Sequence, residues 1–202
     1  MRTAGVILVG GQSKRMGRAK ASLPFGPDSM LSRVVEGVRP AVDSVFVVAA
    51  AGQELPALPA DVDIVYDEEF DRGPLGGLAS ALAAVGEQFC AVFVTACDSP
   101  FIVPAFVKRL IELLGDAPVS VPFVNGRLHP LTTVYRSDIL PAVRDQLARS
   151  QLRMIDLIAR LPSRRVGADE LADVDAAMQT LRNVNTQEEY ELALRDAGYG
   201  SG

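Results

Sequence analysis

Residues 5–20 read GVILVGGQSKRMGRAK, and this stretch decides how the rest of the chain is interpreted. Its continuous apolar run at 6–9 is short enough to be a strand that is buried on both faces. Gly10 and Gly11 follow the run, and adjacent glycines let the backbone turn tightly and present its N–H groups to a ligand. Four basic residues then fall within positions 14–20, so they are either solvated or share an anion. A polyphosphate is the natural anion for such a loop.

Simpler interpretations of this loop remain open on the residues alone. A glycine pair after a strand can be an ordinary turn, and a basic run can be a solvated surface. The Walker pattern does not fit, because Gly10 and Gly17 are too far apart and no Gly-Lys-Ser/Thr follows. A dinucleotide fingerprint does not fit either, since the third glycine is misplaced. The remaining chemical interpretation is a phosphate-binding loop of another kind.

The composition is that of an ordinary globular domain. The 202 residues are 49% apolar and 22% charged, and the formal net charge of −5 argues against general nucleic-acid binding. No apolar run approaches the roughly 18 residues that span a bilayer, and the start reads as a buried strand rather than a signal peptide. Cys90 and Cys97 suit no zinc motif and lie too far apart on one strand to bridge, so we expect reduced core thiols. These features predict a cytoplasmic protein that does not bind membranes.

Apolar periodicity predicts alternating strands and helices. We expect strands at 6–9, 44–50, 62–66, 89–96, 119–123, 131–135 and 164–166. We expect helices at 30–39, 78–85, 104–114, 137–147, 151–161 and 187–195. Asn125-Gly126 predicts a hairpin turn, with 131–135 as the returning strand. This order predicts one three-layer α/β/α Rossmann-like domain over 1–196, with a mostly parallel mixed sheet and a flexible tail at 197–202.

Candidate ligand groups follow several of the predicted strands. Asp98 comes directly after the most hydrophobic run, at the sheet edge where open α/β folds bind ligands, although an aspartate there can also cap a turn. Asp67 ends another strand, and the glycine-rich segment 73–77 follows it with its backbone open on one side. His129 is the only histidine, and a lone histidine is usually structural or exposed. Thr186 and Glu189 predict a capping box, which leaves the preceding Asn185 free for another role.

These segments together resemble the nucleotidyltransferases of the sugar-nucleotide type, and most of all the molybdenum cofactor guanylyltransferases. The loop carries the pattern Gly10-Gly11-x-Ser13-x-Arg15-Met16-Gly17-x-x-Lys20. The later matches are Gly-Pro-Leu-x-Gly at 73–77, Cys-Asp-x-Pro at 97–100, His-Pro at 129–130 and Asn-x-Asn-Thr at 183–186. The resemblance extends from about residue 5 to about residue 189.

The resemblance implies transfer of GMP from GTP to the terminal phosphate of molybdopterin, with release of pyrophosphate and with Mg²⁺ as cofactor. It implies that Lys20, Arg15 and Asp98 are catalytic and that Asp98 and Asn185 hold the metal. The implied nucleotide-binding residues are Leu8, Val9, Gly10, Gly11, Ser13, Lys20, Asp67, Gly73, Pro74, Leu75, Gly76, Gly77 and Asp98. The implied molybdopterin-binding residues are His129, Pro130, Arg153 and Asn183. Transient contact with proteins that deliver or accept the cofactor is a further implication.

The sequence departs from the family pattern at two informative positions. Ala19 stands where the loop usually has an aspartate before its lysine, and Val48 stands where the second strand often ends near an asparagine. The alternatives are therefore a cytidylyltransferase or sugar-phosphate nucleotidyltransferase of the same fold, or a non-catalytic nucleotide-binding relative. GTP-selective binding, CTP preference or nucleotide binding without turnover would distinguish them.

Overall fold

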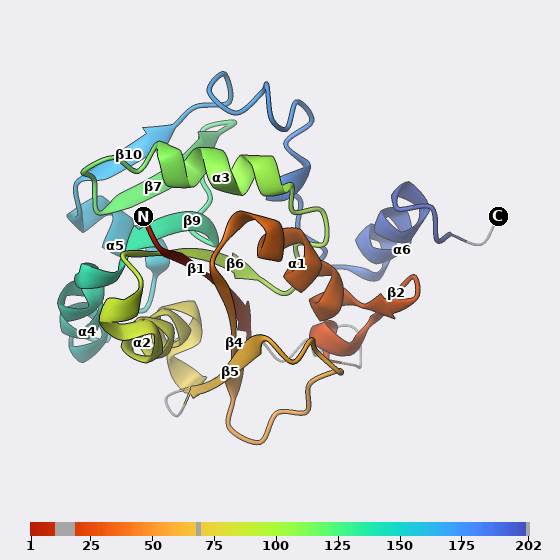
Figure 1. The fold of residues 1–202 in the computed structure, drawn as a ribbon, viewed down its shortest axis with the longest axis horizontal. Coiled ribbons are helices and arrows are strands. Elements are labelled where there is room, and N and C mark those ends of the chain that lie inside the picture. The colour runs from red at the N-terminus through yellow and green to blue at the C-terminus, as the bar shows by residue number, and fades with distance from the viewer. Residues whose placement is uncertain (11–18, 68–69, 201–202) are drawn as a thin grey trace.

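The computed structural model describes residues 1–10, 19–67 and 70–200. Within them, an eight-stranded mixed sheet has the order β10-β7-β9-β6-β1-β4-β5, with β8 paired to β7 (Figure 1). Its strands are β1 Thr3–Val9, β4 Ser44–Ala50, β5 Val62–Asp67, β6 Ala91–Ala96, β7 Val119–Val124, β8 Arg127–Leu128, β9 Thr132–Arg136 and β10 Ser163–Val166. β1 pairs in parallel with β4 and β6, whereas β9 runs antiparallel to β6 and β7. The predicted mostly parallel mixed sheet is confirmed.

Helices cover both faces of the sheet, as Figure 1 shows. The helices are α1 Met30–Val38, α2 Gly73–Val85, α3 Pro104–Glu112, α4 Leu140–Ala148, α5 Met154–Arg160 and α6 Gln187–Asp196. Ile7 and Phe93 pack with α1 and α3, whereas Val6 and Val94 pack with α2, α4 and α5. Successive side chains of a strand point to opposite faces of the sheet, so a strand that is buried on both faces needs an apolar residue at every position. Burying each such side chain stabilises the fold by roughly 1.5–3 kcal/mol.

Helix α2 begins earlier than the sequence predicted. We expected a glycine-rich loop at 73–77 and a helix from residue 78, but the helix starts at Gly73. Gly73 has a φ of +61°, and Pro74 fits the first turn, where a missing N–H has no cost. A Cβ on Gly77 would lie 3.2 Å from Leu8 Cδ2, so this glycine lets α2 pack closely on β1. The expectation of a loop at 73–77 was therefore wrong.

The predicted hairpin forms with a different returning strand. Asn125 and Gly126 both have positive φ, as a tight hairpin turn requires, but the strand that pairs back onto β7 is the short β8. β9, which we expected to complete the hairpin, pairs instead over its whole length with β6 and only with the start of β7. β9 therefore lies between β7 and β6 in the interior of the sheet, where it joins β7 to the parallel strands.

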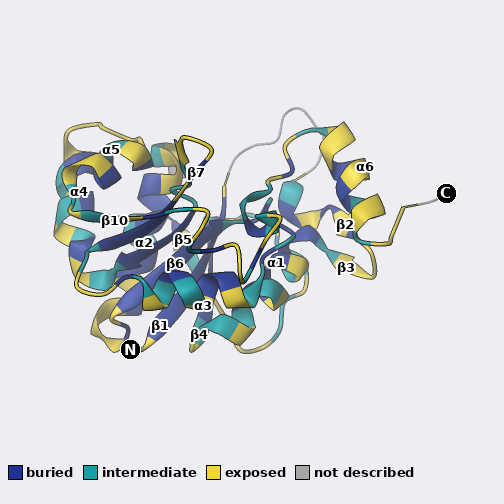
Figure 2. Ribbon diagram, turned by 90° about the horizontal axis from the view of Figure 1, so that it is seen from above, coloured by how far each residue is buried: buried dark blue, intermediate teal, exposed yellow. Residues whose placement is uncertain are grey.

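A small third core lies beside the sheet layers, at the α6 end of the molecule (Figures 1 and 2). The hairpin of β2 Pro24–Phe25 and β3 Asp28–Ser29, which the sequence did not predict, packs against α6 here. Tyr190 of α6 donates a hydrogen bond to the Pro24 carbonyl, and the Tyr199 ring lies edge-on to Phe25 at 6.1 Å. The division into a domain at 1–196 and a tail at 197–202 stays a prediction.

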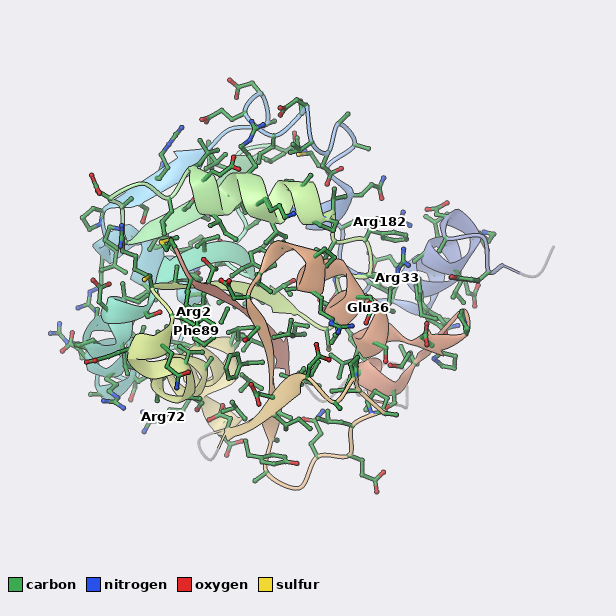
Figure 3. All side chains as sticks on the ribbon, in the orientation of Figure 1. Arg2, Arg33, Glu36, Arg72, Phe89 and Arg182 are labelled. Carbon is green, nitrogen blue, oxygen red and sulfur yellow. The ribbon has the colours of Figure 1, made fainter. Side chains whose placement is uncertain are left out.

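The structure shows how exposed the two cysteines are and whether a described helix could span a membrane. Both cysteines are free, but Cys90 is exposed and only Cys97 is buried, so the prediction of a core thiol was wrong at Cys90. Cys90 precedes β6, and at this amino end the Arg2 guanidinium lies 4.7 Å over the Phe89 ring (Figure 3). Across the described ranges, no helix is long and apolar enough to cross a membrane.

Candidate active site

Lys20, Asp98 and Asn185 meet at the carboxyl edge of the sheet. The Lys20 Nζ lies 2.9 Å from Asp98 Oδ2 and 2.9 Å from Asn185 Oδ1. Lys20 opens a short 3₁₀ turn, Asp98 follows β6, and Asn185 precedes α6. The side chains of Lys20 and Asp98 are 18% and 16% exposed, so the pair can be reached from solvent. This arrangement brings together three residues that the sequence identified separately.

Backbone hydrogen bonds position these residues. The Cys97 N–H donates to the Leu8 carbonyl at 3.2 Å, which ties the Asp98 loop to the end of β1. The Val184 N–H donates to the Asp98 carbonyl at 2.8 Å, and the Ser99 hydroxyl donates to Asn183 Oδ1 at 3.0 Å. Asp98 and Ser99 in the loop after β6 are thus hydrogen-bonded to Val184 and Asn183 in the segment before α6.

The Asp98 loop is also anchored from the side of α1 and α6. Arg33 of α1 donates from Nε to the Pro100 carbonyl at 3.3 Å, and the Arg182 guanidinium lies 4.8 Å over the Phe101 ring. Figure 3 shows both arginines on this side of the molecule. Phe101 in turn meets Phe25 edge-on at 6.1 Å. These contacts hold the loop that carries Asp98 against α1 and the β2–β3 hairpin.

Asn185 owes its position to the start of α6. Thr186 accepts from the Glu189 N–H at 3.1 Å, and Glu189 accepts from the Thr186 N–H at 3.1 Å, so the predicted capping box is confirmed. The Asn185 N–H donates to Glu189 as well, at 2.6 Å. The capping box that starts α6 therefore also places the Asn185 side chain beside Lys20.

The Asp98 carboxylate is only partly satisfied. Its Oδ1 is buried and has no hydrogen-bond partner among the residues that the structure describes, whereas Oδ2 accepts from Lys20. Burial, and next the negative charge of Asp98, raise the pKa of the neighbouring Cys97 thiol to about 12, so this thiol stays neutral. A buried anionic oxygen without a partner is costly, and a hard cation is the ligand that would satisfy it.

The predicted nucleotide side of the site is formed by the ends of β1 and β5 and the start of α2. Gly10 is exposed after Leu8 and Val9, whose side chains are buried in the two cores. Asp67 is buried at the end of β5 and accepts from Ser80 Oγ at 2.9 Å. At the start of α2, Gly73 and Pro74 are exposed, and Leu75, Gly76 and Gly77 are buried. The predicted residues Gly11, Ser13 and Arg15 lie outside the described residues.

The predicted acceptor side lies along the same edge, toward β7 and β10. β9 begins with Thr132 opposite Thr95, so the preceding His129 and Pro130 lie at the edge where β6 ends. Burial, the largest cause, lowers the pKa of His129, Arg127 lowers it further, and a hydrogen bond with the Val124 backbone opposes the shift. The histidine is thus neutral near pH 7. Exposed Arg153 precedes α5, and exposed Asn183 receives the Ser99 hydrogen bond.

Sequence reasoning missed two residues of the site. Ser99, which donates a hydrogen bond to Asn183, lies inside the Cys-Asp-x-Pro segment, and its position in that motif could have indicated a role in the site. Ser80, which bonds to Asp67, carries no local signal, because the contact depends on how α2 docks against β5.

The fold is that of the Rossmann-like nucleotidyltransferases. The structure of molybdopterin-guanine dinucleotide biosynthesis protein A from Archaeoglobus fulgidus matches with a TM-score of 0.78 at 18% identity, covering 97% of this chain and 98% of that one. The 2-C-methyl-D-erythritol 4-phosphate cytidylyltransferase from Thermus thermophilus matches with a TM-score of 0.73 at 19% identity, covering 98% and 100%. At these identities the likeness shows the fold alone.

Sequence similarity identifies the family. The model of the MobA-like NTP transferase domain matches residues 5–165, so the chain belongs to this family. A probable molybdenum cofactor guanylyltransferase from Carboxydothermus hydrogenoformans is 32% identical over 192 residues, which cover 94% of this chain and 93% of the relative. One from Mycobacterium avium is 36% identical over 196 residues, covering 93% and 92%. The resemblance found in the sequence is confirmed.

Proposed function

We propose that the protein transfers GMP from GTP to the terminal phosphate of molybdopterin and releases pyrophosphate. Relatives that share about a third of its residues over nearly its whole length are probable molybdenum cofactor guanylyltransferases. The observation that carries the proposal is the cluster of Lys20, Asp98 and Asn185 at the sheet edge. It supplies a cation for phosphates beside oxygen ligands for a metal.

The chemistry requires alignment and charge neutralisation rather than a strong base. An oxygen of the acceptor phosphate forms a bond to the α-phosphorus, and the bond from that phosphorus to the bridging oxygen breaks. The bridging oxygen leaves with the electron pair as part of pyrophosphate. Because the acceptor oxygen is already ionised near neutral pH, the protein has to hold both substrates in line. We assign Lys20, together with Arg15 and the amides around Gly10 and Gly11, to the triphosphate.

We propose Mg²⁺ as the cofactor, held by Asp98 and Asn185. The unpartnered Asp98 Oδ1 and the Asn185 side-chain oxygen are hard donors that suit this ion. Within the described part of the chain, no three His, Cys, Asp or Glu residues gather to hold a metal, which fits an ion that takes further oxygens from phosphates and water. When bound, Mg²⁺ would neutralise the phosphate charge that develops during transfer.

For the acceptor we propose His129, Pro130, Arg153 and Asn183. Neutral His129 would position molybdopterin through hydrogen bonding, and Arg153 would supply positive charge for its phosphate. We also propose a cytoplasmic location, which two unpaired cysteines support. Transient contact with proteins that deliver or accept the cofactor belongs to the same proposal.

Calorimetric titration with GTP, CTP and ATP, each with and without Mg²⁺, tests the proposal, followed by a turnover assay with molybdopterin. We expect GTP-selective, Mg²⁺-dependent binding that weakens at least about tenfold in Asp98→Ala. Asp116→Ala is the matched control, because Asp116 is exposed in the loop before β7. A preference for CTP would move the protein to the cytidylyl relatives. Failure to bind any nucleotide would refute the proposal.

A further inference from the structure

The Lys20 ammonium sits on the two oxygens that are the best metal donors of the site. Its Nζ lies 2.9 Å from both Asp98 Oδ2 and Asn185 Oδ1, so the two oxygens converge on a single cation. The 3₁₀ turn anchors the backbone beneath this side chain, because Ala21 and Leu23 are buried in different cores. The Lys20 side chain is 18% exposed, so protein does not enclose it on every side.

An ammonium and a divalent ion cannot both occupy this place without a large penalty. Both would face the same carboxylate in a partly buried site, where repulsion between cations is weakly screened. The ammonium also satisfies the pair incompletely, since Asp98 Oδ1 remains without a partner among the described residues. Another cation can therefore displace the Lys20 ammonium from the pair, provided that the ammonium can move to a different anion.

We propose that Asp98 and Asn185 form one cation site with two alternative occupants, Lys20 and a divalent metal, and that nucleotide decides between them. The inference rests on the proposed function, because a bound triphosphate is the anion that draws Lys20 away. Without nucleotide, Lys20 holds the metal affinity low. With nucleotide, Lys20 turns to the phosphates, and the two oxygens become available. Metal and nucleotide then strengthen each other's binding by the same factor.

The test uses Mn²⁺ as a paramagnetic probe and measures its free concentration by electron paramagnetic resonance in the absence of nucleotide. Lys20→Met keeps an unbranched side chain that is only one atom shorter, and it removes the charge. We expect this variant to bind Mn²⁺ at least about tenfold more tightly than the unmodified protein, within the range usual for coupled sites. Lys108→Met is the matched control, because Lys108 is exposed on α3 and its loss changes the net charge equally. Adding Asp98→Asn to Lys20→Met should abolish the gain.

Equal Mn²⁺ affinity in Lys20→Met and in the unmodified protein would overturn the inference, as would an equal gain in Lys108→Met. Circular dichroism melting checks folding, and Lys20→Gln, which keeps a donor at this position, replaces Lys20→Met if that variant does not fold. A second measurement in the unmodified protein compares Mn²⁺ affinity with and without a non-hydrolysable GTP analogue, and we expect a similar gain. If no nucleotide binds but Lys20→Met still gains Mn²⁺ affinity, the proposed function and the control by nucleotide fail, and only the competition between Lys20 and metal for Asp98 and Asn185 stands. If nucleotide binds but neither Lys20→Met nor the GTP analogue raises the Mn²⁺ affinity, only the inference of two alternative occupants fails.

Discussion

Ser99→Ala tests whether the Ser99 hydroxyl sets the orientation of Asn183. Ser99 is 1% exposed, and its hydroxyl donates to Asn183 Oδ1 at 3.0 Å, so the amide nitrogen of Asn183 points away from Ser99. Asn183 itself is exposed. An Asn183 side chain held in this way presents N–H donors outward, which suits an acceptor phosphate.

The size of the effect follows from what is lost. Removing the hydroxyl takes away one neutral hydrogen bond, worth about 0.5–1.5 kcal/mol, and leaves no buried group unpaired because Asn183 can turn to water. Converted to affinity, this corresponds to a rise of roughly 2- to 13-fold in the KM for molybdopterin. We expect kcat and the Kd for GTP to stay within about twofold, since neither depends on the Asn183 amide.

Steady-state kinetics with varied molybdopterin, together with GTP calorimetry, separates these quantities. Ser120→Ala is the control, because Ser120 Oγ is also buried but has no hydrogen-bond partner in the described structure. Ser99→Thr should restore the KM if the hydroxyl is what matters. An unchanged KM in Ser99→Ala, or a loss confined to kcat, would refute the positioning role.

Three further perturbations test other parts of the structure. Because burial lowers the pKa of His129 below its ordinary 6.5, the unfolded chain binds this proton more readily, and the free energy of unfolding should fall as the pH drops below 6.5. In His129→Gln the urea midpoint should therefore change less between pH 7 and pH 5. Alkylation with iodoacetamide at pH 8 should modify exposed Cys90 and spare Cys97, whose pKa is raised to about 12, as peptide mass spectrometry would show. Gly5→Ala would place a Cβ 2.4 Å from Val38 Cγ1 and should cost about 1–3 kcal/mol in urea unfolding, part of which Val38→Ala should restore.

Each of these results has a contrary outcome. Unchanged pH dependence in His129→Gln would mean that other groups control stability in this range. Equal labelling of the two cysteines in the folded protein would contradict the burial of Cys97. If Gly5→Ala leaves stability unchanged with Val38 intact, β1 and α1 can move apart, and the close approach at Gly5 is not required.

Sequence reasoning succeeded where the signal was local. The run at 44–50 became β4 with the same bounds, and the capping box at Thr186 formed as predicted, because burial periodicity and capping depend on neighbouring residues. It failed where packing decided the outcome. Nothing local distinguishes a glycine-rich loop from the first turns of α2, which form as the helix docks on β1. The meeting of Lys20 with Asn185 likewise depends on tertiary structure, and only the family resemblance indicated both residues.

The wide spacing of the Lys20, Asp98 and Asn185 cluster has a consequence for synthesis of the protein on the ribosome. Lys20 is separated from Asp98 by 78 positions and from Asn185 by 165. Every strand of the main sheet lies before residue 167, so a nascent chain can form the complete sheet without the segment that carries Asn185. The site closes only after α6 has emerged and docked on the hairpin near the other end of the chain. A protein whose translation stops short of Asn183 would therefore fold its sheet while lacking both Asn183 and Asn185.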